Sequence, residues 1–140
     1  PRKAITDRTT MTSFAVLVAW SVPLLVAHIL LPSWFSVREH GLAWHASARD
    51  RKKRPQSRLA GRAERTSHNF RETYPAFVAL GLALAVANPA SVLGYYGAII
   101  WFLARIAYVP LYLLGVTYVR SLAWVAAMLG LSMMFLAVVM

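Results

Sequence analysis

The stretch RTSHNFRETYPAFVALGLALAVANP, from Arg65 to Pro89, changes character abruptly after Pro75. Its second half is a run of twelve apolar residues, 76–87, which stops at Asn88-Pro89. Together with the residues from 70 onward, the run is long enough for a helix that crosses a bilayer, where every backbone polar group must be bonded within the segment. The first half is polar, which a plain membrane anchor does not require. The stretch therefore predicts a membrane helix whose first turns have a second task.

The composition of the whole chain agrees with a membrane location. Hydrophobic residues make up 59% of the 140 residues, charged residues only 14%, and the mean hydropathy is +0.53. Soluble domains are about 45–50% apolar, and a core of this size could not bury the excess. The chain has no cysteine, which excludes disulfides, thiolate metal sites and a cysteine nucleophile.

Four segments are long and apolar enough to span a bilayer, which needs about 20 residues per helix. The expected helices cover residues 12–36, 70–87, 91–114 and 120–140, and the second and third connections are short. Short connections join antiparallel neighbours. The sequence therefore predicts an all-α fold, a four-helix up-down bundle that forms a single transmembrane domain over residues 1–140.

The net charge of +10 is concentrated in the expected loop 37–65. Arg120, at the third connection, lies on the same side, so the positive-inside rule places both in the cytoplasm. The basic run RKKRP could instead bind nucleic acid or anionic lipid, but a solvated topology signal is the simpler explanation. We expect no nucleic-acid partner.

Two helices carry polar residues at helical spacing. Arg65, Asn69 and Glu72 are four and three residues apart, and Arg105, Tyr108 and Tyr112 are three and four apart. Each set falls on one helix face, and both faces lie toward the basic end, which predicts one shared pocket. Ionisable side chains at such depth mark functional sites unless they are paired. The competing interpretation is that Glu72 pairs with Arg105 and locks the bundle, or that Arg105 extends to the headgroups.

Single residues outside these faces carry weaker signals. Arg120 could be a positive-inside anchor, and His28 is best interpreted as a hydrogen-bonded packing residue. The spacing of His40, His45 and His68 does not suit a zinc site. We expect no metal.

The two blocks together resemble the MAPEG superfamily, membrane-associated proteins in eicosanoid and glutathione metabolism. The first block is similar to R-x-x-x-N-x-x-E-x-x-P, here Arg65, Asn69, Glu72 and Pro75. The second, RIAYVPLY, is similar to R-x-x-Y-x-x-x-Y on the next helix, and a basic residue then opens the last helix. The stretch GLAWHASARD looks most like the bacterial branch, which implies a bacterial inner membrane.

The resemblance implies a homotrimer with a cytoplasm-facing glutathione site between subunits. The residues that match glutathione-holding positions are Arg38, Arg65, Asn69, Glu72, Arg105, Tyr108 and Tyr112. Arg120 matches the arginine that holds the thiolate and is the expected catalytic residue. Thr73 and Trp124 depart from the pattern of well-known members, where an aromatic residue and a tyrosine, respectively, can stand at these places.

The implied function is a glutathione-dependent transferase or peroxidase that acts on hydrophobic electrophiles arriving from membrane lipids. Arginine forks suit the two carboxylates of glutathione, and Glu72 suits its ammonium group. The alternative is a non-catalytic, lipid-binding or accessory subunit of a larger membrane complex, because ligand-site residues do not by themselves establish turnover.

Overall fold

The computed structural model describes residues 2–48 and 54–140, with side chains from Phe14 onward. Its helices are α1 (Arg2–His40), α2 (Leu42–Ala46), α3 (Arg58–Ala87), α4 (Val92–Leu114) and α5 (Thr117–Val139). The described residues contain no strand, so the predicted all-α class is confirmed. Part of the basic run, residues 49–53, lies outside the described residues.

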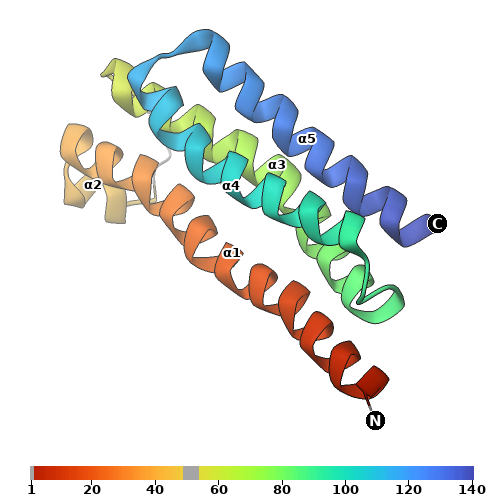
Figure 1. The fold of residues 1–140 in the computed structure, drawn as a ribbon. Helices are drawn as coiled ribbons and strands as arrows, with labels where there is room; N and C mark the ends of the chain where they lie inside the picture. The colour runs from red at the N-terminus through yellow and green to blue at the C-terminus, as the bar shows by residue number, and fades with distance from the viewer. Residues whose placement is uncertain (1, 49–53) are drawn as a thin grey trace.

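The four long helices run alternately up and down (Figure 1). Helix α1 packs against α3, α4 packs along α5, and α3 also contacts both α4 and α5. The termini lie at the same end as the α3–α4 connection, whereas α2 and the α4–α5 turn lie at the other end (Figure 1). The predicted up-down bundle is therefore the observed arrangement.

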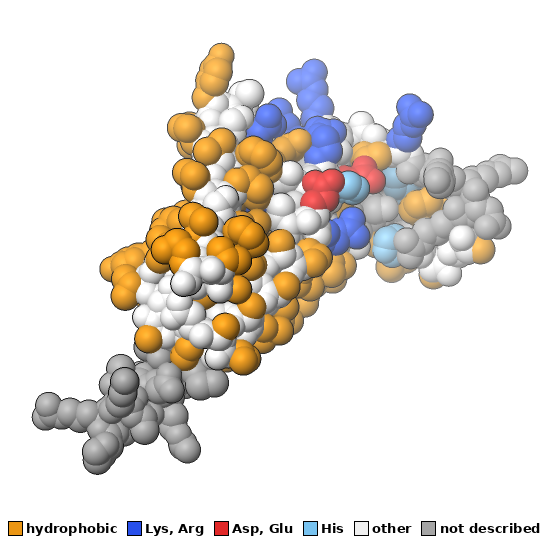
Figure 2. All heavy atoms as spheres, turned by 90° about the vertical axis from the view of Figure 1, so that its right-hand side faces the viewer, with side chains coloured by type: hydrophobic (Ala, Val, Ile, Leu, Met, Phe, Trp, Pro, Cys, Tyr) orange, Lys and Arg blue, Asp and Glu red, His pale blue; other side chains and the backbone are white. Residues whose placement is uncertain are grey.

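Each long helix can cross a membrane by length and composition. The candidate spans are 27, 30, 23 and 23 residues long, and at 1.5 Å per residue even about 23 residues exceed the roughly 30 Å of hydrocarbon. Large apolar side chains point outward along them, for example Trp20, Val86 and Leu122. On the face in Figure 2, charged side chains gather toward one end and hydrophobic ones cover the rest. This distribution suits a protein surrounded by lipid.

Helices α1, α3 and α5 are longer than the expected ranges, and α1 begins at Arg2 instead of residue 12. Helix α1 continues to His40, α3 begins at Arg58 instead of residue 70, and α5 begins at Thr117. Hydropathy marks only the part of a helix that lies in hydrocarbon, so polar turns beyond it escape a search for apolar runs. The first connection shrinks to residues 41–57 and contains α2.

The beginning of α3 is fixed by contacts that cross the connection. The Ser57 hydroxyl accepts a hydrogen bond from Ala60 N at 3.1 Å, as an N-cap residue does. The carboxylate of Glu39, near the end of α1, accepts from Gln56 N at 2.8 Å and Ser57 N at 2.9 Å. Glu39 thereby ties the end of α1 to the start of α3.

Helix α2 folds back over the end of α1. Gly41 between them has φ of +81°, a conformation that glycine adopts without steric cost. The reversal brings the Trp44 ring to within 4.9 Å of the His40 ring, measured between centroids. The C-terminal end of α1, α2 and the start of α3 thus enclose a space at the charged end.

Helices α4 and α5 approach each other most closely at two glycines. A Cβ atom on Gly97 would lie 2.7 Å from the Gly130 carbonyl oxygen, and one on Gly130 would lie 2.6 Å from the Gly97 carbonyl oxygen. Small residues permit such backbone contact between membrane helices. This packing holds the start of α5, and with it Arg120, beside α4.

Replacing Gly130 with valine should destabilise the bundle, because the obstacle is backbone and cannot rotate away. Overpacking of this kind costs about 1–3 kcal/mol. We expect Gly130→Val to lower the melting temperature of the detergent-purified protein, whereas Ser132→Val, at an exposed position of the same helix, should leave it nearly unchanged. Equal melting temperatures for the two variants would mean that the close approach contributes nothing.

Candidate functional site

The guanidinium of Arg105, on α4, is completely buried against α3. Its side chain is 0% exposed; Nη1 donates to Asn69 Oδ1 at 2.7 Å, and Nη2 donates to Thr73 Oγ1 at 2.8 Å. The Thr73 hydroxyl in turn donates to the Phe70 carbonyl oxygen at 3.2 Å. The guanidinium is therefore held in one orientation, while its Nε is buried with no hydrogen-bond partner.

A second group of contacts joins α3, α4 and α5 nearer the charged end. Arg65 Nε donates to the Tyr112 hydroxyl at 3.1 Å. The guanidinium carbons of Arg65 and Arg120 lie 5.9 and 4.6 Å from the centroid of the Tyr112 ring. Cations at this distance from an aromatic face are attracted to it. Tyr112 thus holds two arginines from two different helices beside it.

Tyr108 connects the two groups. Its ring centroid is 5.4 Å from that of Tyr112 and 5.7 Å from the Arg105 guanidinium carbon. One continuous set results, which we call the arginine–tyrosine cluster: Arg65, Asn69, Arg105, Tyr108, Tyr112 and Arg120. The side chains of the two polar helix faces, apart from Glu72, therefore lie next to one another.

The cluster carries positive charge without a bonded counter-charge. Across the described side chains, no carboxylate forms an ion pair with Arg65, Arg105 or Arg120. Glu72 instead lies 3.2 Å from His68 Nδ1, and both side chains are largely exposed, at 57% and 70%. The alternative in which Glu72 pairs with Arg105 and locks the bundle is not what the structure contains, because neutral oxygens take that position. Glu72 lies at the edge of the cluster, one turn from Asn69.

The sequence pattern and the fold point to the same family. A sequence model described as MAPEG family matches residues 17–140. The chain belongs to the MAPEG family. Comparison with curated proteins and with solved structures gave no match. Family membership and the four long apolar helices make this an integral membrane protein.

One residue that the MAPEG resemblance places in the site lies apart from the cluster. Arg38, near the end of α1, is exposed, and its guanidinium carbon lies 5.5 Å above the Trp34 ring. It stands two residues after Ser36 and two before His40, which both face α3, so it points about 200° away from that face. Within one chain, Arg38 therefore faces away from the arginine–tyrosine cluster.

Two side chains with structural roles at the MAPEG site were missed by sequence reasoning. Thr73 was noted only as a departure from the family pattern, yet it accepts one of the two hydrogen bonds of Arg105. Arg62 fell inside the expected loop, yet its Nη1 donates to the Leu113 carbonyl oxygen at 2.7 Å. The only sequence signal for the Arg62 contact was Gly115. A glycine at this place predicts the end of a helix, where the last carbonyl oxygens attract basic side chains, and in the structure Gly115 ends α4 with φ of +80°.

His28 behaves as the packing histidine that the sequence indicates. Its side chain is buried, Nδ1 lies 2.7 Å from the Leu24 carbonyl oxygen, and the ring stacks on Phe70 at 3.9 Å between centroids. Since a carbonyl oxygen can only accept, Nδ1 carries the proton. His28 thus supports the helix that presents the cluster and does not belong to it.

Proposed function

We propose that this chain is a membrane-bound, glutathione-dependent transferase or peroxidase that acts on hydrophobic electrophiles. The observation that carries the proposal is Arg105, a buried cation held by two neutral oxygens with no carboxylate bonded to it. A buried charge without a partner is costly, and in membrane segments it marks a ligand site by default. Together with Arg65 and Arg120 it creates a site that favours an anion.

Glutathione fits this donor set, since it carries two carboxylates and one ammonium group. Arg65, which is exposed, would hold a carboxylate through its planar fork, and the buried charge of Arg105 would add to the attraction for the anion. Asn69, half-buried beside Arg105, can donate and accept along a peptide bond. Glu72 would receive the ammonium group, because it is exposed at the edge of the cluster and paired only with His68.

A homotrimer with the site between subunits accounts for Arg38. Because Arg38 faces away from α3 of its own chain, it can reach a cluster only on a neighbouring subunit. Such a contact would also cover Glu72, which is more than half exposed in the single chain. We further propose that the charged end of the bundle faces the cytoplasm of a bacterium, with the protein in the inner membrane.

When bound, glutathione supplies a thiol that must ionise before it can attack an electrophile. Arg120 is the catalytic residue of the proposal, because a nearby guanidinium favours a thiolate over a thiol. The Tyr108 and Tyr112 hydroxyls are further donors for the sulfur. The outer faces of α1, α4 and α5 are apolar and would let a hydrophobic electrophile arrive through the lipid.

Glutathione binding to the detergent-purified protein, measured by calorimetry, tests the proposal. We expect wild type to bind and Glu72→Gln to lose at least tenfold in affinity, because a charged hydrogen bond is worth about 1.5–3 kcal/mol. The matched control changes the ligand: glutathione acetylated on its amine should bind weakly and equally to both proteins, since it has no ammonium group for Glu72.

The possible results separate the two candidate functions. No binding by folded wild-type protein would contradict the glutathione site. Binding that is lost in the variant, without turnover of any electrophile, would favour the alternative of a non-catalytic accessory subunit. Binding together with thiol-dependent turnover would favour the enzyme.

A further inference from the structure

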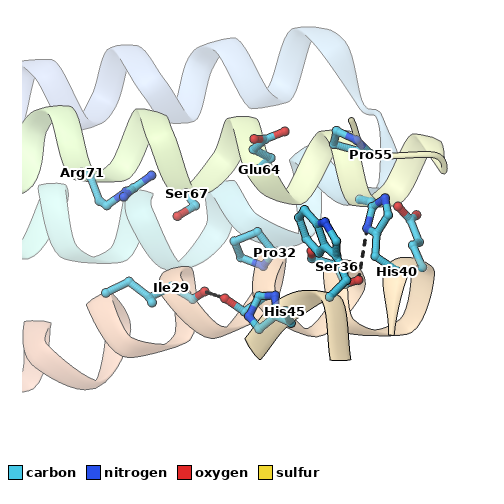
Figure 3. Close-up of a pocket in the computed structure, with 13 residues that line it drawn as sticks. Ile29, Pro32, Ser36, His40, His45, Pro55, Glu64, Ser67 and Arg71 are labelled. Atoms are coloured by element: carbon cyan, nitrogen blue, oxygen red, sulfur yellow. Dashed lines mark hydrogen bonds between the residues drawn. The ribbon is translucent and has the colours of Figure 1, made fainter. Parts of the chain in front are cut away.

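A cavity lies between α1, α2 and α3, on the side of α3 away from the arginine–tyrosine cluster. It measures about 360 Å³ and is enclosed by the C-terminal half of α1, by α2 and by the first turns of α3 (Figure 3). Helix α3 contributes Glu64, Ser67 and Arg71 to its wall. Asn69 of the arginine–tyrosine cluster is two residues from both Ser67 and Arg71, about 200° around the helix. The cavity is therefore separate from the proposed glutathione site, and its volume falls in the range of small-molecule pockets, about 300–1,000 Å³.

Two side chains of opposite charge in this cavity have no bonded partner within the described residues. Arg71 and Glu64 are both exposed, and neither has an ion pair or a side-chain hydrogen bond with another residue in the described part of the chain. They are seven residues apart on α3, which is about 10 Å along the helix axis. Ser67 lies between them, and its side chain is only 3% exposed (Figure 3). The wall thus presents a cation, a hydroxyl and a carboxylate in a line.

The line runs along α3, which is one of the candidate membrane spans. Sixteen residues separate Arg71 from Ala87 at the end of α3, about 24 Å of helix, so Arg71 lies close to the edge of roughly 30 Å of hydrocarbon. Glu64 lies farther out, among the headgroups. Ile29 is at the same end of the cavity as Arg71, whereas His40 and Pro55 are at the opposite end (Figure 3). From outside to inside, the cavity therefore presents carboxylate, hydroxyl, cation and apolar surface.

We propose that this cavity binds one phospholipid whose phosphate carries a primary amine, as in phosphatidylethanolamine. Such a lipid presents ammonium, phosphate and acyl chains in the same order along the membrane normal. Arg71 holds the phosphate, Ser67 donates to it, and Glu64 receives the ammonium group. Ile29 and Pro32 contact the start of an acyl chain, and the Trp44 ring closes the cavity at the interface, where tryptophan is favoured.

The charges discriminate between lipid classes. An anionic headgroup without an amine would place negative charge beside Glu64, which is unfavourable. The other carboxylate of the cavity, Glu39, already accepts one backbone hydrogen bond on each oxygen, whereas the Glu64 carboxylate has no bond to the described part of the chain. A trimethylated amine offers no N–H donor to Glu64, so phosphatidylcholine binds less tightly than the primary amine. The site is therefore selective for a zwitterion that can donate hydrogen bonds.

Native mass spectrometry of the full-length, detergent-purified protein tests this selectivity. For wild type we expect phosphatidylethanolamine to bind at least tenfold more tightly than phosphatidylcholine or phosphatidylglycerol. Arg71→Gln should weaken binding of all three lipids, because each carries a phosphate. Glu64→Gln should abolish only the preference for the amine, and Glu64→Lys should transfer the preference to phosphatidylglycerol. Arg58→Gln, an exposed arginine of α3 outside this cavity, is the matched control and should behave as wild type.

The remaining results would overturn the proposal. An unchanged preference of Glu64→Gln for phosphatidylethanolamine would mean that the carboxylate does not bind the amine. Tight binding of soluble glycerophosphoethanolamine, equal to that of the lipid, would reveal a site for a water-soluble phosphate ester instead. Because both charged side chains are exposed, their variants should keep the wild-type melting temperature in detergent, so a loss of binding is not a loss of folding.

Discussion

Arg105→Met should weaken glutathione binding without lowering the stability of the bundle. We expect at least a tenfold loss of affinity, since the variant removes a buried charge that attracts the carboxylates, and an interaction with a charged group is worth about 1.5–3 kcal/mol. The variant also releases Asn69, whose amide is oriented by Arg105 Nη1 at 2.7 Å. Calorimetry gives the affinity and a thermal melt in detergent gives the stability.

The stability half of this prediction follows from the absence of a bonded counter-charge. Removing one partner of a buried ion pair destabilises a protein because the other charge is left behind. When Arg105 is replaced, the groups that lose their partner are only the neutral oxygens of Asn69 and Thr73, and both residues are half-buried. Replacing a whole buried ion pair with apolar side chains is often neutral or stabilising, and Arg105 has no partner charge among the described residues to leave behind. The melting temperature of Arg105→Met should therefore equal or exceed that of wild type.

Two further variants make the result interpretable. Arg105→Lys keeps the charge but loses the planar fork, so it should weaken glutathione binding while retaining part of it. Arg58→Ala removes an exposed arginine at the start of α3 and should change neither quantity. A sharp fall in the melting temperature of Arg105→Met, with glutathione affinity intact, would show instead that Arg105 serves to hold the helices together.

The sequence sufficed to predict the membrane spans and the two polar helix faces. Apolar runs of the right length report lipid contact directly, and spacings of three and four residues place Arg65 near Asn69 and Arg105 near Tyr108 whatever the tertiary structure is. The meeting of the two faces also followed, because short connections bring antiparallel neighbours together. The family resemblance added glutathione as the expected ligand, which no spacing could suggest.

The contacts between helices were beyond the reach of the sequence. Which oxygens receive the Arg105 guanidinium depends on the rotation of α3 against α4, and Thr73 has no local feature that distinguishes it. Arg62 reaches the end of α4 across 51 residues of sequence, and Glu39 reaches Ser57 across 18. Hydropathy also placed the beginning of α3 too late, so the turns that carry Glu64 were assigned to a loop. For that reason nothing in the sequence indicated the cavity between α1, α2 and α3.

Helix α3 emerges as the organising element of the charged end. One face presents Arg65 and Asn69 toward α4 and α5, and the opposite face presents Glu64 and Arg71 toward α1 and α2. This arrangement answers why the stretch before the apolar run is so polar. Both faces need charged side chains, because both lie at the boundary where small polar ligands and lipid headgroups are accessible.

Arg120→Ala should remove most of the thiol-dependent turnover while leaving glutathione binding nearly intact. In the proposed function, Arg120 favours the thiolate, whereas the carboxylates of glutathione are held by Arg65 and attracted by the charge of Arg105. A free thiol has a pKa of about 8.5, so only about 3% is ionised at pH 7. Loss of the guanidinium should therefore lower kcat at pH 7 by about 30-fold if the wild-type enzyme holds the thiol almost fully ionised.

The pH profile separates this role from that of a topological anchor. A guanidinium beside the sulfur lowers the thiol pKa, so wild-type kcat should reach its plateau below neutral pH. In Arg120→Ala, kcat should rise with pH through about 8.5 and approach the wild-type value in alkaline solution, because bulk pH then ionises the thiol. The pKa of the bound thiol, measured in parallel from the ultraviolet absorbance of the thiolate, should shift by the same amount.

Arg120→Lys keeps a cation, so its pH profile should fall between those of wild type and Arg120→Ala, whereas Arg58→Ala should follow wild type. Superimposable profiles for wild type and Arg120→Ala would remove Arg120 from the chemistry, and its position 4.6 Å above the Tyr112 ring would then serve only to hold α5 against α4.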